Sequence, residues 1–211
     1  MEPTELQKEA SAQLRYIRDT MARSSAFTDI PGWGIFIVGL IALVASWLTS
    51  GFRPAFWTVS WKDTWMLTAI VSAAVGVTML VRKAKAAQHP VTHGPIRKFA
   101  LGMLPAIVAA MVLTSAFTHR TGLDAYLSGQ MLPADPMAAH LHALWLLLYG
   151  VAIVSSGMHS IRVVPLMGLC FMALGVVAFA FPDLPKTAMM TIGFGGLHLI
   201  FGYLIAKKYG G

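Results

Sequence analysis

Six runs of apolar residues, separated by short polar segments, dominate the hydrophobic pattern of the chain. Each run holds about 20 residues, enough for a helix that rises about 1.5 Å per residue to cross a hydrocarbon layer about 30 Å thick. The pattern therefore predicts an all-α integral membrane protein with six transmembrane helices. We expect the spans at Pro31–Ser50, Lys62–Val81, Lys98–Phe117, Met137–Ser155, Val163–Phe181 and Thr187–Ala206.

The first thirty residues follow a different pattern. Thr4-Glu5-Leu6-Gln7 has the form of a capping box, and apolar residues then recur at helical spacing. We expect an N-terminal amphipathic interfacial helix, which lies on the headgroups, packs on the protein or offers a docking surface to a partner. The predicted domains are a cytoplasmic amphipathic helix at 1–30, a six-helix transmembrane domain at 31–206 and a cytoplasmic tail at 207–211.

Composition and charge agree with a membrane protein. Hydrophobic residues make up 56% of the chain and charged residues 12%. The basic residues behind the net charge of +7 lie beside apolar segments, which indicates topology and contact with anionic lipid headgroups rather than nucleic acid. With the basic cluster between the second and third spans in the cytoplasm, 12 of the 16 Lys and Arg residues lie inside, together with both termini. Short loops and the lack of asparagine, hence of N-glycosylation sites, fit a multi-pass protein of a bacterial cell inner membrane. The sequence pattern allows either a monomer or an oligomer.

Two junctions between spans resemble each other. His93-Gly94-Pro95-Ile96-Arg97 and His159-Ser160-Ile161-Arg162 match with one gap, and each opens an odd-numbered span. We therefore expect three hairpin repeats, each made of two consecutive spans and inserted with the same orientation.

Two polar residues fall at the same depth in different spans. Tyr149 and His198 both lie about 18 Å below the outer boundary at about 1.5 Å per residue. An unpaired polar group in hydrocarbon costs several kcal/mol, so we expect a hydrogen bond between them. The bond either fixes helix packing or belongs to a site for a ligand, haem or quinone. The candidate ligand-binding residues are His198, Tyr149, Trp145, Gly195, Gly202 and Cys170.

His142 is the candidate metal ligand, near the outer end of the fourth span. The spacing His-x-His turns His140 about 200° away from His142 on a helix, so the two rings do not chelate one ion there. The cofactor is unknown; a b-type haem is an alternative, with His142 and Met111 at one level. The loop His119–Pro136 is the longest connection between spans, and we expect it to cover any site that opens outward.

Several function classes are disfavoured. All nine acidic residues lie outside the spans or at their ends, whereas ion-coupled transporters commonly carry a carboxylate at mid-membrane. The chain shows no catalytic triad order, phosphate loop or HExxH motif. We therefore expect a non-enzymatic binding or accessory role, with a small hydrophobic ligand or lipid held between helices near Tyr149 and His198. The alternatives are a haem- or metal-binding redox protein and a carrier for a neutral solute.

Overall fold

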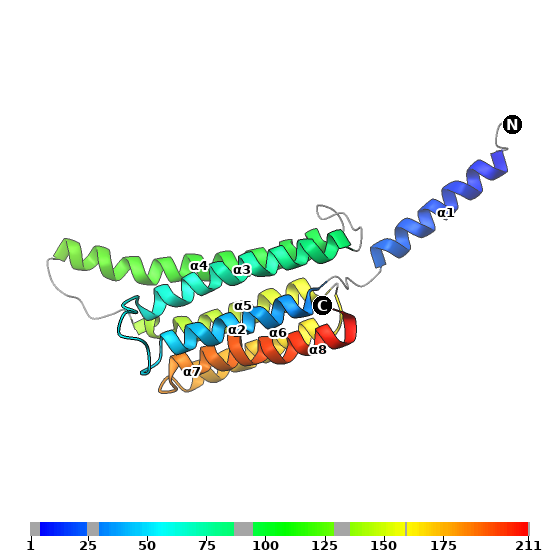
Figure 1. The fold of residues 1–211 in the computed structure, drawn as a ribbon. Helices are drawn as coiled ribbons and strands as arrows, with labels where there is room; N and C mark the ends of the chain where they lie inside the picture. The colour runs from blue at the N-terminus through cyan, green and yellow to red at the C-terminus, as the bar shows by residue number, and fades with distance from the viewer. Residues whose placement is uncertain (1–4, 25–29, 87–94, 129–135, 159, 211) are drawn as a thin grey trace.

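The computed structural model describes residues 5–24, 30–86, 95–128, 136–158 and 160–210, with backbone alone at 6, 18–24, 95, 119–128 and 136. Within these residues every secondary-structure element is a helix. The elements are α1 (Glu5–Ser24), α2 (Gly32–Leu48), α3 (Trp61–Ala86), α4 (Pro95–Ser128), η1 (Pro136–His140), α5 (Leu141–Gly157), α6 (Val163–Ala180), α7 (Lys186–Met190), η2 (Thr191–Leu197) and α8 (His198–Tyr209). The last three run on without a break as one rod (Figure 1).

Five of the described helical stretches are long and apolar enough to cross a membrane, and the shorter α2 is apolar as well. This confirms the prediction of an all-α, multi-pass membrane protein with about six spans. Of the predicted N-terminal element, α1 is a helix of 20 residues. It stands apart from the bundle in Figure 1, and its side chains Leu14 and Ile17 are 67% and 52% exposed.

The segment expected as a covering loop is partly helical. Helix α4 continues past His119 to Ser128, so the loop prediction is wrong for residues 119–128. Its 34 residues extend about 51 Å at about 1.5 Å per residue, well beyond a hydrocarbon layer of about 30 Å. Figure 1 shows this end of α4 projecting past the neighbouring helices. The helix continues because this stretch contains no proline and only one glycine, which a helix tolerates. Residues 129–135 lie outside the described part of the chain.

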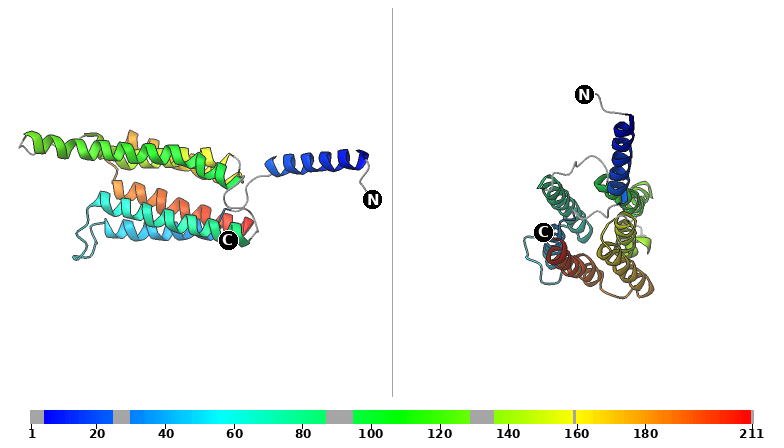
Figure 2. Two further views of the ribbon diagram at one scale, coloured as in Figure 1. Left: turned by 90° about the horizontal axis from the view of Figure 1, so that it is seen from above. Right: turned by 90° about the vertical axis from the view of Figure 1, so that its right-hand side faces the viewer.

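The spans form two groups of three (Figure 2, left). In one group, called here the first half of the bundle, α2 lies between α3 and the rod made of α7, η2 and α8. In the other group, called the second half, α5 lies between α4 and α6. This grouping differs from the expected three hairpins, because α6 packs chiefly on α5 and α8 chiefly on α2. Of the junctions that suggested a repeat, His93, Gly94 and His159 lie outside the described residues.

Glycines set the close contacts within each half. A Cβ atom at Gly202 in α8 would lie 2.5 Å from the backbone nitrogen of Phe36 in α2. A Cβ atom at Gly150 in α5 would lie 2.7 Å from the carbonyl oxygen of Gly168 in α6. Membrane helices gain little from the hydrophobic effect against one another, so backbone approach at small residues supplies much of the packing attraction.

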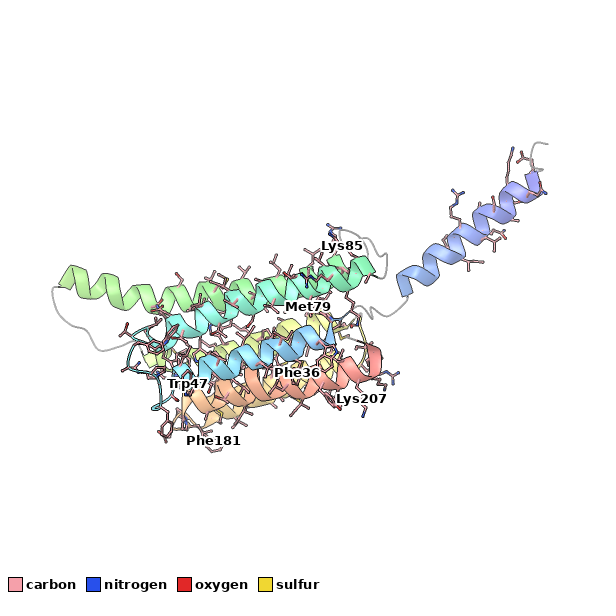
Figure 3. The ribbon with its side chains drawn as sticks, in the orientation of Figure 1. Phe36, Trp47, Met79, Lys85, Phe181 and Lys207 are labelled. Atoms are coloured by element: carbon pink, nitrogen blue, oxygen red, sulfur yellow. The ribbon has the colours of Figure 1, made fainter. Side chains whose placement is uncertain are left out.

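The two ends of the bundle differ in chemistry. At one end the Nζ atom of Lys83 donates hydrogen bonds to the carbonyl oxygens of Ile30 (3.0 Å), Tyr209 (3.3 Å) and Gly210 (2.7 Å). Lys83 thereby joins the end of α3 to the start of α2 and the end of α8. Figure 3 shows Lys85 and Lys207 at this same end, with Trp47 and Phe181 at the opposite end.

Candidate functional site

The predicted pair of polar residues meets in the middle of the bundle. The hydroxyl of Tyr149, on α5, lies 2.8 Å from Nε2 of His198, at the start of α8. This confirms the hydrogen bond expected from depth. His198 is only 2% exposed, and Tyr149 is half-buried. Because α5 belongs to the second half and α8 to the first, the bond joins the two halves.

Aromatic rings enclose the pair. Phe194 stacks on His198 with ring centroids 5.9 Å apart and an interplanar angle of 16°. Phe171, from α6, meets His198 edge-on at 5.3 Å and Tyr149 at 4.9 Å. With its ring covered on these sides, His198 offers a ligand little accessible surface in this arrangement. The site as described is a packed aromatic cluster with one buried polar bond.

His198 follows directly on a π-helix. The seven residues of η2 include Gly193, Gly195 and Gly196, and a Cβ atom at Gly193 would overlap the side chain of Leu146 on α5. The Nδ1 atom of His198 is buried without a hydrogen-bond partner. Single π-turns inside α-helices occur frequently at functional sites. The π-helix therefore indicates that η2 and the residues next to it are a candidate functional region.

The other predicted ligand residues face different neighbours. Gly195 and Gly202 pack against α2 rather than α5. The Nε1 atom of Trp145 donates to Oγ1 of Thr114 on α4 at 2.9 Å, which turns this ring away from His198. Cys170, a free thiol on α6, is half-buried at the edge of the core.

His142, the candidate metal ligand, is 3% exposed. Its Nδ1 atom lies 3.0 Å from the carbonyl oxygen of Ala139, and its Nε2 atom is buried without a partner. In the described part of the chain, no group of three or more His, Cys, Asp or Glu side chains is placed to hold a metal ion. Met111, considered with His142 for haem, is 52% exposed.

An open pocket of about 560 Å³ lies where the end of α2 meets the start of α7 and η2. Its lining is rich in hydroxyl groups and contains no charged side chain. The lining residues are Ser46, Thr49, Ser50, Gly51, Pro185, Thr187, Ala188, Thr191 and Ile192. Thr191 is also the first residue of η2, so the π-helix runs from the pocket to His198.

Comparison with known protein families, curated proteins and solved structures found no match to this chain.

The pocket was not predicted from sequence. Its walls come from residues 46–51 and 185–192, which are far apart in the chain, and Ser and Thr in membrane helices usually bond to their own backbone. One side-chain contact joins the two walls, and a second joins the wall at 185–192 to α3. Ser46 and Thr191 share a short hydroxyl contact, and Nε1 of Trp61 donates to Oγ1 of Thr187 at 3.0 Å.

Proposed function

We propose that the protein is a non-enzymatic membrane protein that binds a lipid or another small amphiphile between its helices. The observation that carries this proposal is the open, hydroxyl-lined pocket between α2 and the last span. Ligand sites in membrane and soluble proteins are concave, largely apolar and supplied with a few polar groups that fix orientation. A volume of about 560 Å³ suits the polar part and first carbons of an amphiphile.

The surface below the pocket suits an apolar chain. Ile192 lines the pocket and is 49% exposed. Leu43, one turn below Ser46 on α2, is 36% exposed and reaches the backbone of η2 at Gly195. The seam between α2 and η2 is therefore apolar and accessible from the lipid side. In this proposal the Tyr149–His198 bond holds the two halves together, and the pocket hydroxyls contact the ligand.

We further propose the cell inner membrane, with both termini cytoplasmic. The distribution of Lys and Arg supports this orientation, because basic residues favour the cytoplasmic ends of spans. The pocket then opens at the outer leaflet, since it lies at the end of α2 far from the C-terminus. Helix α1 lies on the cytoplasmic headgroups, where its exposed Leu14 and Ile17 enter the lipid and its basic residues meet anionic lipid.

Native mass spectrometry tests the binding role. The protein, in mild detergent, is equilibrated with an equal mixture of zwitterionic and anionic phospholipids. Ala188→Phe fills the pocket, whereas Ala73→Phe adds the same ring to the exposed face of α3 as a control. We expect one lipid to remain bound to the wild type and to Ala73→Phe and to be lost from Ala188→Phe. Absence of a bound lipid from the wild type, or its full retention in Ala188→Phe, would contradict the proposal.

A further inference from the structure

The hydroxyl groups of the pocket differ in what they still offer to a ligand. Thr49 Oγ1 donates to the carbonyl oxygen of Ala45 at 2.8 Å, and Ser50 Oγ donates to that of Trp47 at 2.8 Å. Thr191 Oγ1 donates to the carbonyl oxygen of Thr187 at 2.6 Å. Since the hydrogen of Thr191 is used there, its contact with Ser46 has Ser46 as the donor.

Four of the five hydroxyl hydrogens are thus committed inside the protein. Among the pocket hydroxyl groups, only Thr187 donates no hydrogen bond; its oxygen accepts one from Nε1 of Trp61. Every hydroxyl oxygen retains at least one lone pair. A ligand that donates hydrogen bonds can therefore bind at Ser46, Thr49 and Ser50 without breaking an internal bond. A ligand that only accepts finds a free hydrogen at Thr187 alone, and at the other four hydroxyl groups it must first displace an internal bond.

The end of α2 adds an electrostatic preference for a cation, which agrees with the preference of the hydroxyl groups for a hydrogen-bond donor. Ser46, Thr49 and Ser50 belong to the last turn of α2 and the residues just after it, where Thr49 is the C-cap. The aligned peptide dipoles of a helix give its C-terminus a partial negative charge of about half an elementary charge, which favours a cation. No basic side chain lies in the last turn of α2 to supply that cation.

The opposite wall has the complementary chemistry. Lys186 lies between two lining residues, Pro185 and Thr187, and its Nζ atom sits 4.8 Å from the ring centroid of Trp61. The Lys186 side chain is not part of the pocket lining, so its ammonium acts on a ligand only at longer range, where it disfavours one that carries only positive charge. Thr187 does line the pocket, and its free hydroxyl hydrogen is available to an anionic group next to the cation.

We propose that the pocket binds the head group of a zwitterionic phospholipid with a primary ammonium group, that is, a phosphoethanolamine head group. The ammonium donates to the hydroxyl oxygens on the α2 side, and the phosphate lies toward the hydroxyl group of Thr187. The acyl chains follow the apolar seam past Ile192. This inference rests on the proposed binding function and names the chemical class of its ligand.

A methylation series separates hydrogen bonding from charge. Phosphatidylethanolamine, its N-methyl and N,N-dimethyl derivatives and phosphatidylcholine carry the same charge and chains but progressively fewer N–H donors. Retention of each lipid is measured by native mass spectrometry with matched acyl chains. We expect retention to fall along the series, by at least about tenfold overall, the change produced by about 1.4 kcal/mol. Equal retention of all four lipids would overturn the ammonium assignment yet leave lipid binding intact, whereas no retention of any lipid would overturn both.

A pair of threonine variants locates the effect. Thr49→Val removes a lining hydroxyl, and Thr78→Val removes a hydroxyl with the same kind of bond to a backbone carbonyl on the exposed face of α3. We expect Thr49→Val to reduce the preference for phosphatidylethanolamine over phosphatidylcholine, and Thr78→Val to keep it. An unchanged preference in Thr49→Val would overturn the site. Soluble glycerophosphoethanolamine should fail to displace the lipid; displacement would show that the head group alone is the ligand and overturn the lipid assignment.

Discussion

Lys83 offers the sharpest test of how the bundle is closed at its basic end. Its ammonium group joins three chain segments through the carbonyl oxygens of Ile30, Tyr209 and Gly210. Lys83→Met keeps the length and the apolar stem of the side chain but removes all three bonds. The carbonyl groups at the end of α8 then lose a charged partner that also complements the helix dipole.

The magnitude follows from burial. The bonds to Ile30 and Tyr209 are partly buried, whereas the bond to Gly210 is exposed to solvent. A partly buried hydrogen bond contributes about 1 kcal/mol net, and an exposed one contributes little. Lys83→Met should therefore cost about 2 kcal/mol, which for a chain of this length lowers the unfolding midpoint by about 4–8 °C.

Lys85→Met is the matched control, because it removes the same charge from an exposed position on the same helix. Thermal unfolding in mild detergent compares the two variants with the wild type. Hydrogen exchange should in addition be faster in the last turn of α8 for Lys83→Met alone. Equal midpoints and equal exchange for the two variants would refute the assignment of Lys83 as the residue that joins these ends.

Two further pairs of variants, each with its own control, test the packing of the spans by the same unfolding measurement. Tyr149→Phe leaves Nε2 of His198 unpaired and should cost about 1 kcal/mol, whereas Tyr203→Phe, on the exposed face of α8, should be neutral. Gly202→Ala brings a Cβ atom onto the backbone of α2 and should cost about 1–3 kcal/mol, whereas Gly76→Ala, with open space around it, should not destabilise. The reverse order within either pair would contradict the packing described.

The number and approximate position of the spans could be predicted because the bilayer sets the length of an apolar run. Residues beyond the hydrocarbon have no such constraint, and this is why the extension of α4 to Ser128 was missed. The hydrophobic pattern of the sequence also does not predict which helices pack against each other. Whether α8 packs on α2 or on α6 depends on local shape, such as the fit of Gly202 against Phe36, and short apolar runs look alike in composition.

Depth was the most informative quantity in the membrane region. Helical rise converts a position in the chain into a level, and Tyr149 and His198 pair as their common level required. Depth does not decide direction, however. Trp145 lies one turn from Tyr149 on α5, yet its indole donates to Thr114 on α4 while Tyr149 bonds to α8. A helix between two neighbours divides its residues between them.

Depth along the spans also predicts where the pocket lies, once hydroxyl groups are considered together with histidine and tyrosine. A histidine or tyrosine buried in lipid needs a partner at its own depth, whereas a serine or threonine hydroxyl can bond to its own helix, so its depth alone predicts no partner. Ser46 lies in the last turn of α2, and Thr191 lies in the second turn of the last span, so the two are at one level near the same boundary. A level shared by several hydroxyls at the ends of two spans marks a place where polar groups gather at the edge of the hydrocarbon. That is where an amphiphile also changes from polar to apolar, so the physical requirement that stabilises the pocket hydroxyls also suits the proposed ligand.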